Sequence, residues 1–135
     1  MLDLLRTNIA AHLRANLPDI VTVLELDNTA DAAALERLSM ASPAVGVEIV
    51  GTDGLTVMGG APYATASIGV SVICTPQLDA DGVAKDATQA ALGLITMVLA
   101  HIADQHFELV SGKPESVRAT NLTAGDIETN GTALW

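Results

Sequence analysis

The residues best suited to acid–base or metal chemistry in this chain are its three histidines, His12, His101 and His106. If residues 101–106 are helical, His101 and His106 stand about 140° apart around the axis, because each residue turns a helix by ~100°. Two side chains so far apart cannot readily share one metal ion. We therefore interpret these histidines as partly exposed helical residues, and we predict no metal site.

A weak calcium-loop pattern occurs at Gln77–Gly82. With the glycine at the sixth loop position, the first and twelfth positions fall on Gln77 and Thr88, and neither supplies the carboxylate that such a loop needs. We interpret Asp81-Gly82 as a turn before a helix. The acidic residues near the start of this predicted helix are Asp79, Asp81 and Asp86. Negative charge is stabilised there by the positive end of the helix dipole.

Cys74 is the only cysteine, so no intrachain disulfide can form and a reducing compartment is expected. It lies on the apolar face of an alternating segment with no base near it in the sequence, which favours a buried structural thiol over a nucleophile. The catalytic and nucleotide-binding motifs in common use are absent from the sequence. We therefore predict no catalytic residue and no cofactor, and we expect that the protein is not an enzyme. An alternative stays open: a small intracellular ligand-binding or enzyme domain using His12, His101 or acidic residues.

The composition of the 135 residues favours a closely packed core over a ligand-binding pocket. Hydrophobic residues make up 50% of the chain but aromatic residues only 2%, so the core must consist of Leu, Ile, Val and Ala. Such a core offers few large side chains to line a ligand pocket. Sixteen acids against six bases give a net charge of −10, which argues against nucleic-acid binding. The longest apolar stretch, Ala90–Ala100, is too short to span a membrane, and no signal peptide is recognisable, so we expect a soluble intracellular protein.

The hydrophobic pattern predicts alternating helices and strands. Leucines and isoleucine at spacings of three and four predict a helix over residues 2–17, which Pro18 ends. Alternating residues at 65–75 predict a strand with an apolar face and a small, polar face. Further predicted elements are strands at 20–26, 43–49, 116–122, 126–129 and 132–135, a short helix at 32–38 and a long, almost wholly apolar helix at 83–106. Together they predict one α+β domain over residues 1–135, with a single mixed, largely antiparallel sheet and the long helix and the N-terminal helix packed on one face.

Apolar residues near a predicted hairpin tip form the candidate interface. Asp53-Gly54 predicts a hairpin turn with Leu55–Met58 as the return arm, because both turn residues tolerate positive φ. An apolar tip either folds back on its own core or contacts a neighbouring subunit. For the second case we predict interface residues at the tip and at the terminal tryptophan: Leu55, Val57, Met58 and Trp135.

The order of these motifs resembles the Mu-like phage tail terminator family. The match begins with the leucine-rich N-terminal helix and the Ser42–Val47 segment, which is similar to the family's Pro-x-Val-x-Val strand. It continues with the alternating strand at 66–75 and the long helix. It ends with Asn121-Leu122 and with Gly131–Trp135, which resembles the family's closing Gly-x-Ala-Leu-Trp segment. Relatives continue the last strand beyond the tryptophan at which this chain stops.

The resemblance implies a structural, non-enzymatic virion protein at the head-proximal end of the tail, assembled in the host cytoplasm. It implies a ring, expected to be a homohexamer, that caps the tail tube, ends its polymerisation and offers a surface for head joining. The implied partners are other copies of the chain, the tube protein, the sheath protein and a head-completion protein. DNA would pass through the lumen without specific binding. Two alternatives stay open: a head–tail connector or minor tail protein of the same particle, and an adaptor that only dimerises.

Overall fold

The computed structural model describes residues 2–27, 32–75, 77–78, 84–103, 105, 107 and 133–134. The elements in chain order are α1 (Leu2–Asn16), β1 (Thr22–Glu25), α2 (Ala32–Met40), β2 (Ala44–Met58), β3 (Ala61–Cys74), β4 (Gln77–Leu78), β5 (Ala84–Lys85), α3 (Ala87–Ile102) and β6 (Ala133–Leu134). Four strands form one sheet in the order β1-β2-β3-β6, and β4 and β5 form a separate pair. β1 is parallel to β2, whereas β2–β3 and β3–β6 are antiparallel. The predicted α+β class is confirmed.

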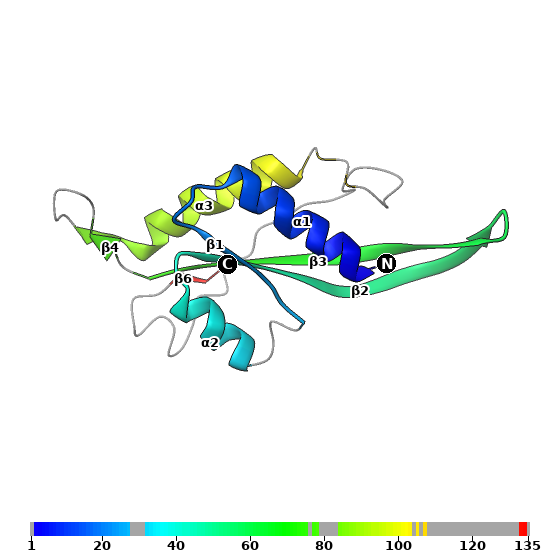
Figure 1. Ribbon diagram of the computed structural model, residues 1–135, viewed down its shortest axis with the longest axis horizontal. Helices are drawn as coiled ribbons and strands as arrows, with labels where there is room; N and C mark the ends of the chain where they lie inside the picture. The colour runs from blue at the N-terminus through cyan, green and yellow to red at the C-terminus, as the bar shows by residue number, and fades with distance from the viewer. Residues whose placement is uncertain are drawn as a thin grey trace.

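The sheet has helices on both faces (Figure 1). Buried residues of α1 and α3 share one hydrophobic cluster with Val45, Val47 and Val72 of the sheet. α2 buries Leu38 in a second cluster with Ala44 of β2. The packing of α1 and α3 on one face agrees with the sequence prediction. The sequence analysis did not predict that α2 lies on the opposite face.

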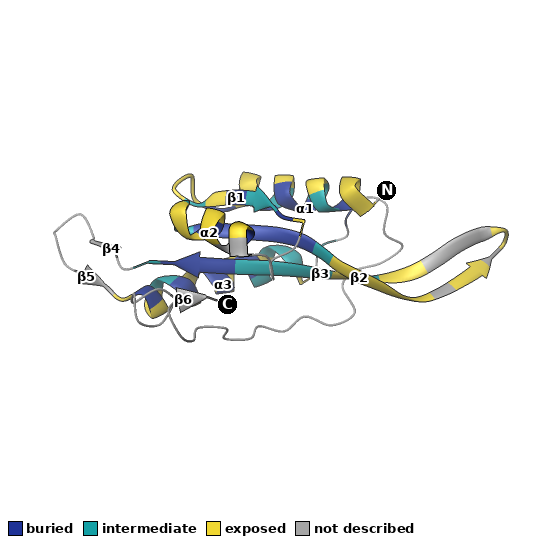
Figure 2. Ribbon diagram, turned by 90° about the horizontal axis from the view of Figure 1, so that it is seen from below, coloured by how far each residue is buried: buried dark blue, intermediate teal, exposed yellow. Residues whose placement is uncertain are grey.

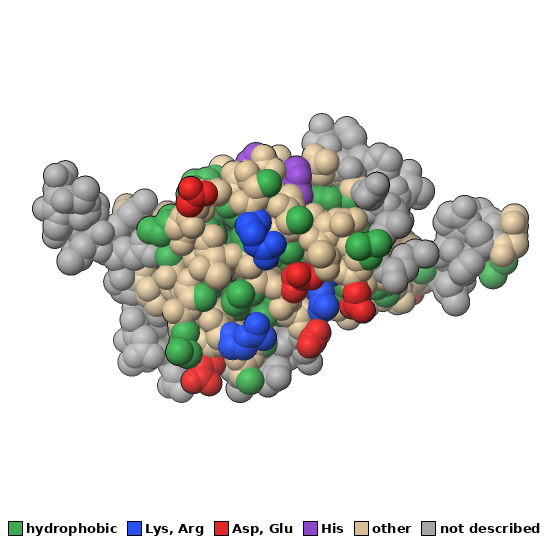
Figure 3. Space-filling model, in the orientation of Figure 1, with side chains coloured by type: hydrophobic (Ala, Val, Ile, Leu, Met, Phe, Trp, Pro, Cys, Tyr) green, Lys and Arg blue, Asp and Glu red, His purple; other side chains and the backbone are tan. Residues whose placement is uncertain are grey.

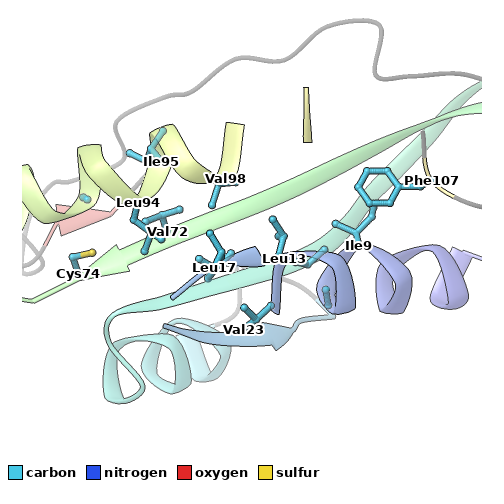
Figure 4. Close-up of a cluster of buried hydrophobic side chains, with 14 of the residues drawn as sticks. Ile9, Leu13, Leu17, Val23, Val72, Cys74, Leu94, Ile95, Val98 and Phe107 are labelled. Atoms are coloured by element: carbon cyan, nitrogen blue, oxygen red, sulfur yellow. The ribbon is translucent and has the colours of Figure 1, made fainter. Parts of the chain in front are cut away.

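The main core lies between α1, α3 and the sheet, and it is almost wholly aliphatic (Figure 4). α1 contributes the residues whose spacing predicted an amphipathic helix, including Leu5, Ile9 and Leu13, all of them buried. The helix ends at Asn16 because Pro18 disfavours helical backbone at the residue before it. The alternating apolar residues of β3 also belong to this cluster, as predicted: Ala66, Ile68, Val70, Val72 and Cys74.

The start of α3 differs from the prediction. The helix begins at Ala87, and residues 84–85 form β5 instead of helix, so the predicted start at Val83 is wrong. Asp86 determines the start: its backbone is extended, and its side chain accepts a hydrogen bond from the backbone N–H of Thr88 at 3.1 Å. Val83 and His106, the predicted ends of this helix, lie outside the described residues. So do the predicted strands at 116–122 and 126–129. β6 falls within the predicted strand at 132–135.

Gly46 is the point of closest approach between the sheet and α2. A Cβ at this position would lie 2.4 Å from Cδ1 of Leu26 and 3.1 Å from Cδ2 of Leu38. Both leucines are fully buried, so neither can move aside without repacking the cluster around α2.

The first prediction follows from this contact. Gly46→Ala should lower the free energy of unfolding by about 1–3 kcal/mol through overpacking. Gly51→Ala is the matched control on the same strand, because a Cβ there meets nothing within 4 Å. Urea denaturation of the two variants checks the prediction, and equal stabilities would contradict it.

Candidate subunit interface

β2 and β3 extend well beyond the rest of the sheet. β1 pairs only with Ala44–Val47 of β2, and β6 pairs only with Ile73–Cys74 of β3. Past these pairs the two long strands continue as a two-stranded ribbon that projects from one end of the molecule (Figure 1), and most of the ribbon that is described is exposed (Figure 2). We call residues 50–67 the arm. Because an isolated two-stranded hairpin is only marginally stable in water, such a projection is typical of a segment that contacts another chain.

The arm turns at Gly59-Gly60, and the predicted turn at Asp53-Gly54 is wrong. Gly59 and Gly60 have φ angles of 58° and 80°, and the flanking residues pair across a two-residue loop. A type I′ turn needs positive φ at both central residues, which Gly-Gly provides at a lower steric cost than Asp-Gly. Gly54 uses its own positive φ of 64° in a β-bulge, where its N–H donates to Oδ1 of Asp53 at 2.7 Å.

A second bulge lies where the arm leaves the sheet. The register passes from Ile49↔Ile68 directly to Gly51↔Ser67, so Val50 has no partner on β3. Bulges increase the local twist and bend the strand that carries them. The side chain of Val50 is 65% exposed, although its neighbour Ile49 packs against the core. Val50 is therefore an exposed apolar residue at the base of the arm.

The predicted interface residues Leu55, Val57 and Met58 lie on the last stretch of β2, next to the turn. Val57 is 71% exposed, so its side chain does not fold back on the core. The side chains of Leu55 and Met58 lie outside the described residues, and so does Trp135. The sequence analysis missed Val50, because the bulge that leaves it unpaired depends on the register of β2 with β3.

The arm carries few charged side chains. Residues 50–67 carry one charged side chain, Asp53, in a protein with a net charge of −10, and α3 carries no Asp, Glu, Lys or Arg. Figure 3 shows basic and acidic side chains side by side on the face formed by α1 and α2. Copies of a strongly acidic protein repel one another. Contact between copies is therefore favoured where charge is lowest, which includes the arm.

Two arginines of α1 bind β1 and the residues that follow it. Arg14 Nη2 donates to the carbonyl of Val23 at 2.9 Å. Arg6 Nη1 donates to the carbonyl of Leu26 at 2.9 Å and to Oδ1 of Asp27 at 2.8 Å. The hydrogen bond to Asp27 raises the pKa of Arg6 above its ordinary value, so this residue stays charged. Charged side chains beside an edge strand such as β1 oppose the addition of another strand.

His12 and His101 form a contact between α1 and α3. The structure brings His12 and His101 together from α1 and α3, a contact that the sequence analysis missed: His12 Nε2 lies 3.0 Å from the carbonyl oxygen of His101. The ring of His12 also stands edge-on to Phe107, with centroids 5.5 Å apart. Among the residues that the structure describes, no group of three or more His, Cys, Asp or Glu side chains could hold a metal ion.

None of the helices in the described part of the chain is long and apolar enough to cross a membrane. No known protein family matches the chain, and no significantly similar protein was found among curated sequences or solved structures.

Proposed function

We propose that this protein is a structural virion subunit that assembles with copies of itself into a ring, and that the ring is a phage tail terminator. The observation that carries the proposal is the arm, an exposed and almost uncharged ribbon that leaves the core of an otherwise acidic molecule. Exposed apolar side chains on a projecting segment are typical of contact sites between proteins. On this proposal, Val50 and Val57 contribute to the contact between subunits.

The position of the arm suits a ring. It projects from one end of the long axis of the molecule (Figure 1). When such an extremity contacts a different surface of the next copy, and that copy's own arm contacts a third copy, the contact is heterologous. Heterologous contacts close into a ring when the rotation between neighbours permits, and otherwise extend into a filament.

The place of the ring in the particle rests on the resemblance of the sequence to Mu-like tail terminators. The supporting features are the Ser42–Val47 segment, the alternating strand that follows it, the long apolar helix and the closing Gly131–Trp135 segment. A terminator caps the tail tube at its head-proximal end, stops its polymerisation and meets the head-completion protein. The partners would be the tube protein, the sheath protein and the head-completion protein.

The net charge of −10 suits a channel through which DNA passes. Like charges repel, so an acidic lumen would let the phosphate backbone slide without binding. Neutralising the acids that line the assembled lumen should then slow DNA ejection. Unchanged ejection and DNA retention in such a variant would remove this part of the proposal.

A second prediction tests termination. Adding the purified protein to polymerising tube protein of the same particle should give shorter tubes, each capped at one end, in electron micrographs. The mean tube length should fall as the ratio of added protein to tube protein rises. Rings that form but leave tube length unchanged would contradict a terminator and favour the alternative, a head–tail connector or minor tail protein.

A further inference from the structure

A second exposed and uncharged surface lies on α3. Leu92 is 46% exposed and Met97 40% exposed, although both belong to a helix whose opposite side lies in the core. Exposed residues at spacings of one and four around them complete a continuous strip, which we call the α3 outer face: Leu92, Gly93, Thr96, Met97 and Ala100. The strip carries no charge, and it is the exposed side of the helix that the sequence predicts to be almost wholly apolar.

Gly93 makes no room for a neighbouring group within the described part of its own subunit. Among those residues, a Cβ at this position would meet nothing within 4 Å. Glycine inside a helix costs about 1 kcal/mol relative to alanine. A glycine on an exposed strip lets the backbone of another chain approach the helix closely.

We infer that the arm of one subunit packs along the α3 outer face of the next subunit in the ring. The inference rests on the proposed function and adds the surface that receives the arm. Two surfaces with few charges can meet without the repulsion that a net charge of −10 imposes elsewhere. A ribbon with small residues can lie close to Gly93, with Val57 near the tip of the arm beside Met97.

The dimensions and positions of the two surfaces agree with this contact. Residues 50–58 of the arm span roughly 30 Å at ~3.3 Å per residue. The α3 outer face, residues 92–100, spans roughly 13 Å at ~1.5 Å per residue, so it can receive the half of the arm nearest the turn. The tip of the arm lies at one end of the long axis, and the first turns of α3 lie towards the other end (Figure 1). When the arm of each subunit reaches a different neighbour, this contact is heterologous, as a ring requires.

Mixed cysteine variants provide the third prediction. Val57→Cys and Met97→Cys proteins are prepared separately, mixed, and treated with a short bismaleimide. A crosslinked dimer is expected from the mixture and from neither variant alone, because each crosslink joins the arm of one copy to α3 of another. The native Cys74 is buried, and the wild-type protein controls for its reactivity. Crosslinking of Val57→Cys alone would show arm-to-arm contact and overturn the inference.

The Gly93→Ala variant distinguishes an effect on the contact between subunits from an effect on folding. The substitution should raise the melting temperature of the monomer, because alanine favours the helix and the site is open. It should weaken assembly at least several-fold, because the added methyl group separates the arm from the helix. A more stable monomer that assembles as well as the wild type would overturn the inference but leave the proposed ring intact. If the wild type formed no assembly, the proposed function and this inference would both fail.

Discussion

Leu13→Ala is expected to lower the free energy of unfolding by ~2–5 kcal/mol, the range for a large side chain removed from a core that cannot collapse. Leu13 is 0% exposed and lies in the main core with residues of α3 and the sheet (Figure 4). An aliphatic core with few aromatic residues depends on close contact among many small side chains. Such a loss is a large fraction of the stability of a small domain.

Leu4→Ala is the matched control for this prediction. Leu4 lies on the same helix and is 52% exposed, so its truncation removes the same atoms with much less loss of packing. Urea denaturation followed by circular dichroism gives both values. The packing of α1 against the sheet would be contradicted if the two variants lost the same stability.

The second large effect concerns assembly. The double variant Val50→Glu/Val57→Glu should reduce the association constant by about a hundredfold or more, because an unpaired buried charge costs several kcal/mol. Both residues are mostly exposed in the single chain, so the melting temperature of the monomer should hardly change. Sedimentation velocity over a range of concentrations measures the association.

A control variant distinguishes the effect of added negative charge elsewhere on the surface from the effect of negative charge placed in the interface. Ala11→Glu/Ala15→Glu places two glutamates on the exposed side of α1 and gives the same net charge as the arm variant. This control should assemble nearly as well as the wild type, and salt should remove the remaining difference. If both double variants lost assembly equally, general repulsion would explain the effect and the arm would have no special part in it.

Much of the fold could be predicted from the sequence where a periodic pattern is long. The spacing of Leu5, Ile9 and Leu13 predicted α1, and Pro18 predicted where the helix ends. The alternation over residues 66–74 gave both the strand and the face that packs against the core. In these segments local preference and tertiary packing agree, so the pattern alone suffices.

The errors occurred where two local preferences competed. Asp53-Gly54 and Gly59-Gly60 both tolerate positive φ, and only the pairing of β2 with β3 decides which of them turns the chain. Val83 fits the apolar pattern of α3, but the cap at Asp86 starts the helix later. The position of α2 across the sheet depends on the absence of a side chain at Gly46, which hydrophobic periodicity does not reveal.

The candidate interface could be predicted only in part. Apolar residues beside a turn indicated that Val57 lies near an exposed tip. The sequence did not show that two strands of 15 and 14 residues would carry this tip far beyond the core. It also did not show the bulge that turns Val50 outward, because bulges depend on the register between two strands.

The most direct test of self-assembly through the arm is the solution mass of the wild-type protein, measured by light scattering over a concentration series beside the Val50→Glu/Val57→Glu variant. We predict a discrete hexameric mass for the wild type and the mass of one 13.8 kDa chain for the variant. A monomeric wild type throughout the series, or a hexamer that the arm substitutions leave unchanged, would contradict the account.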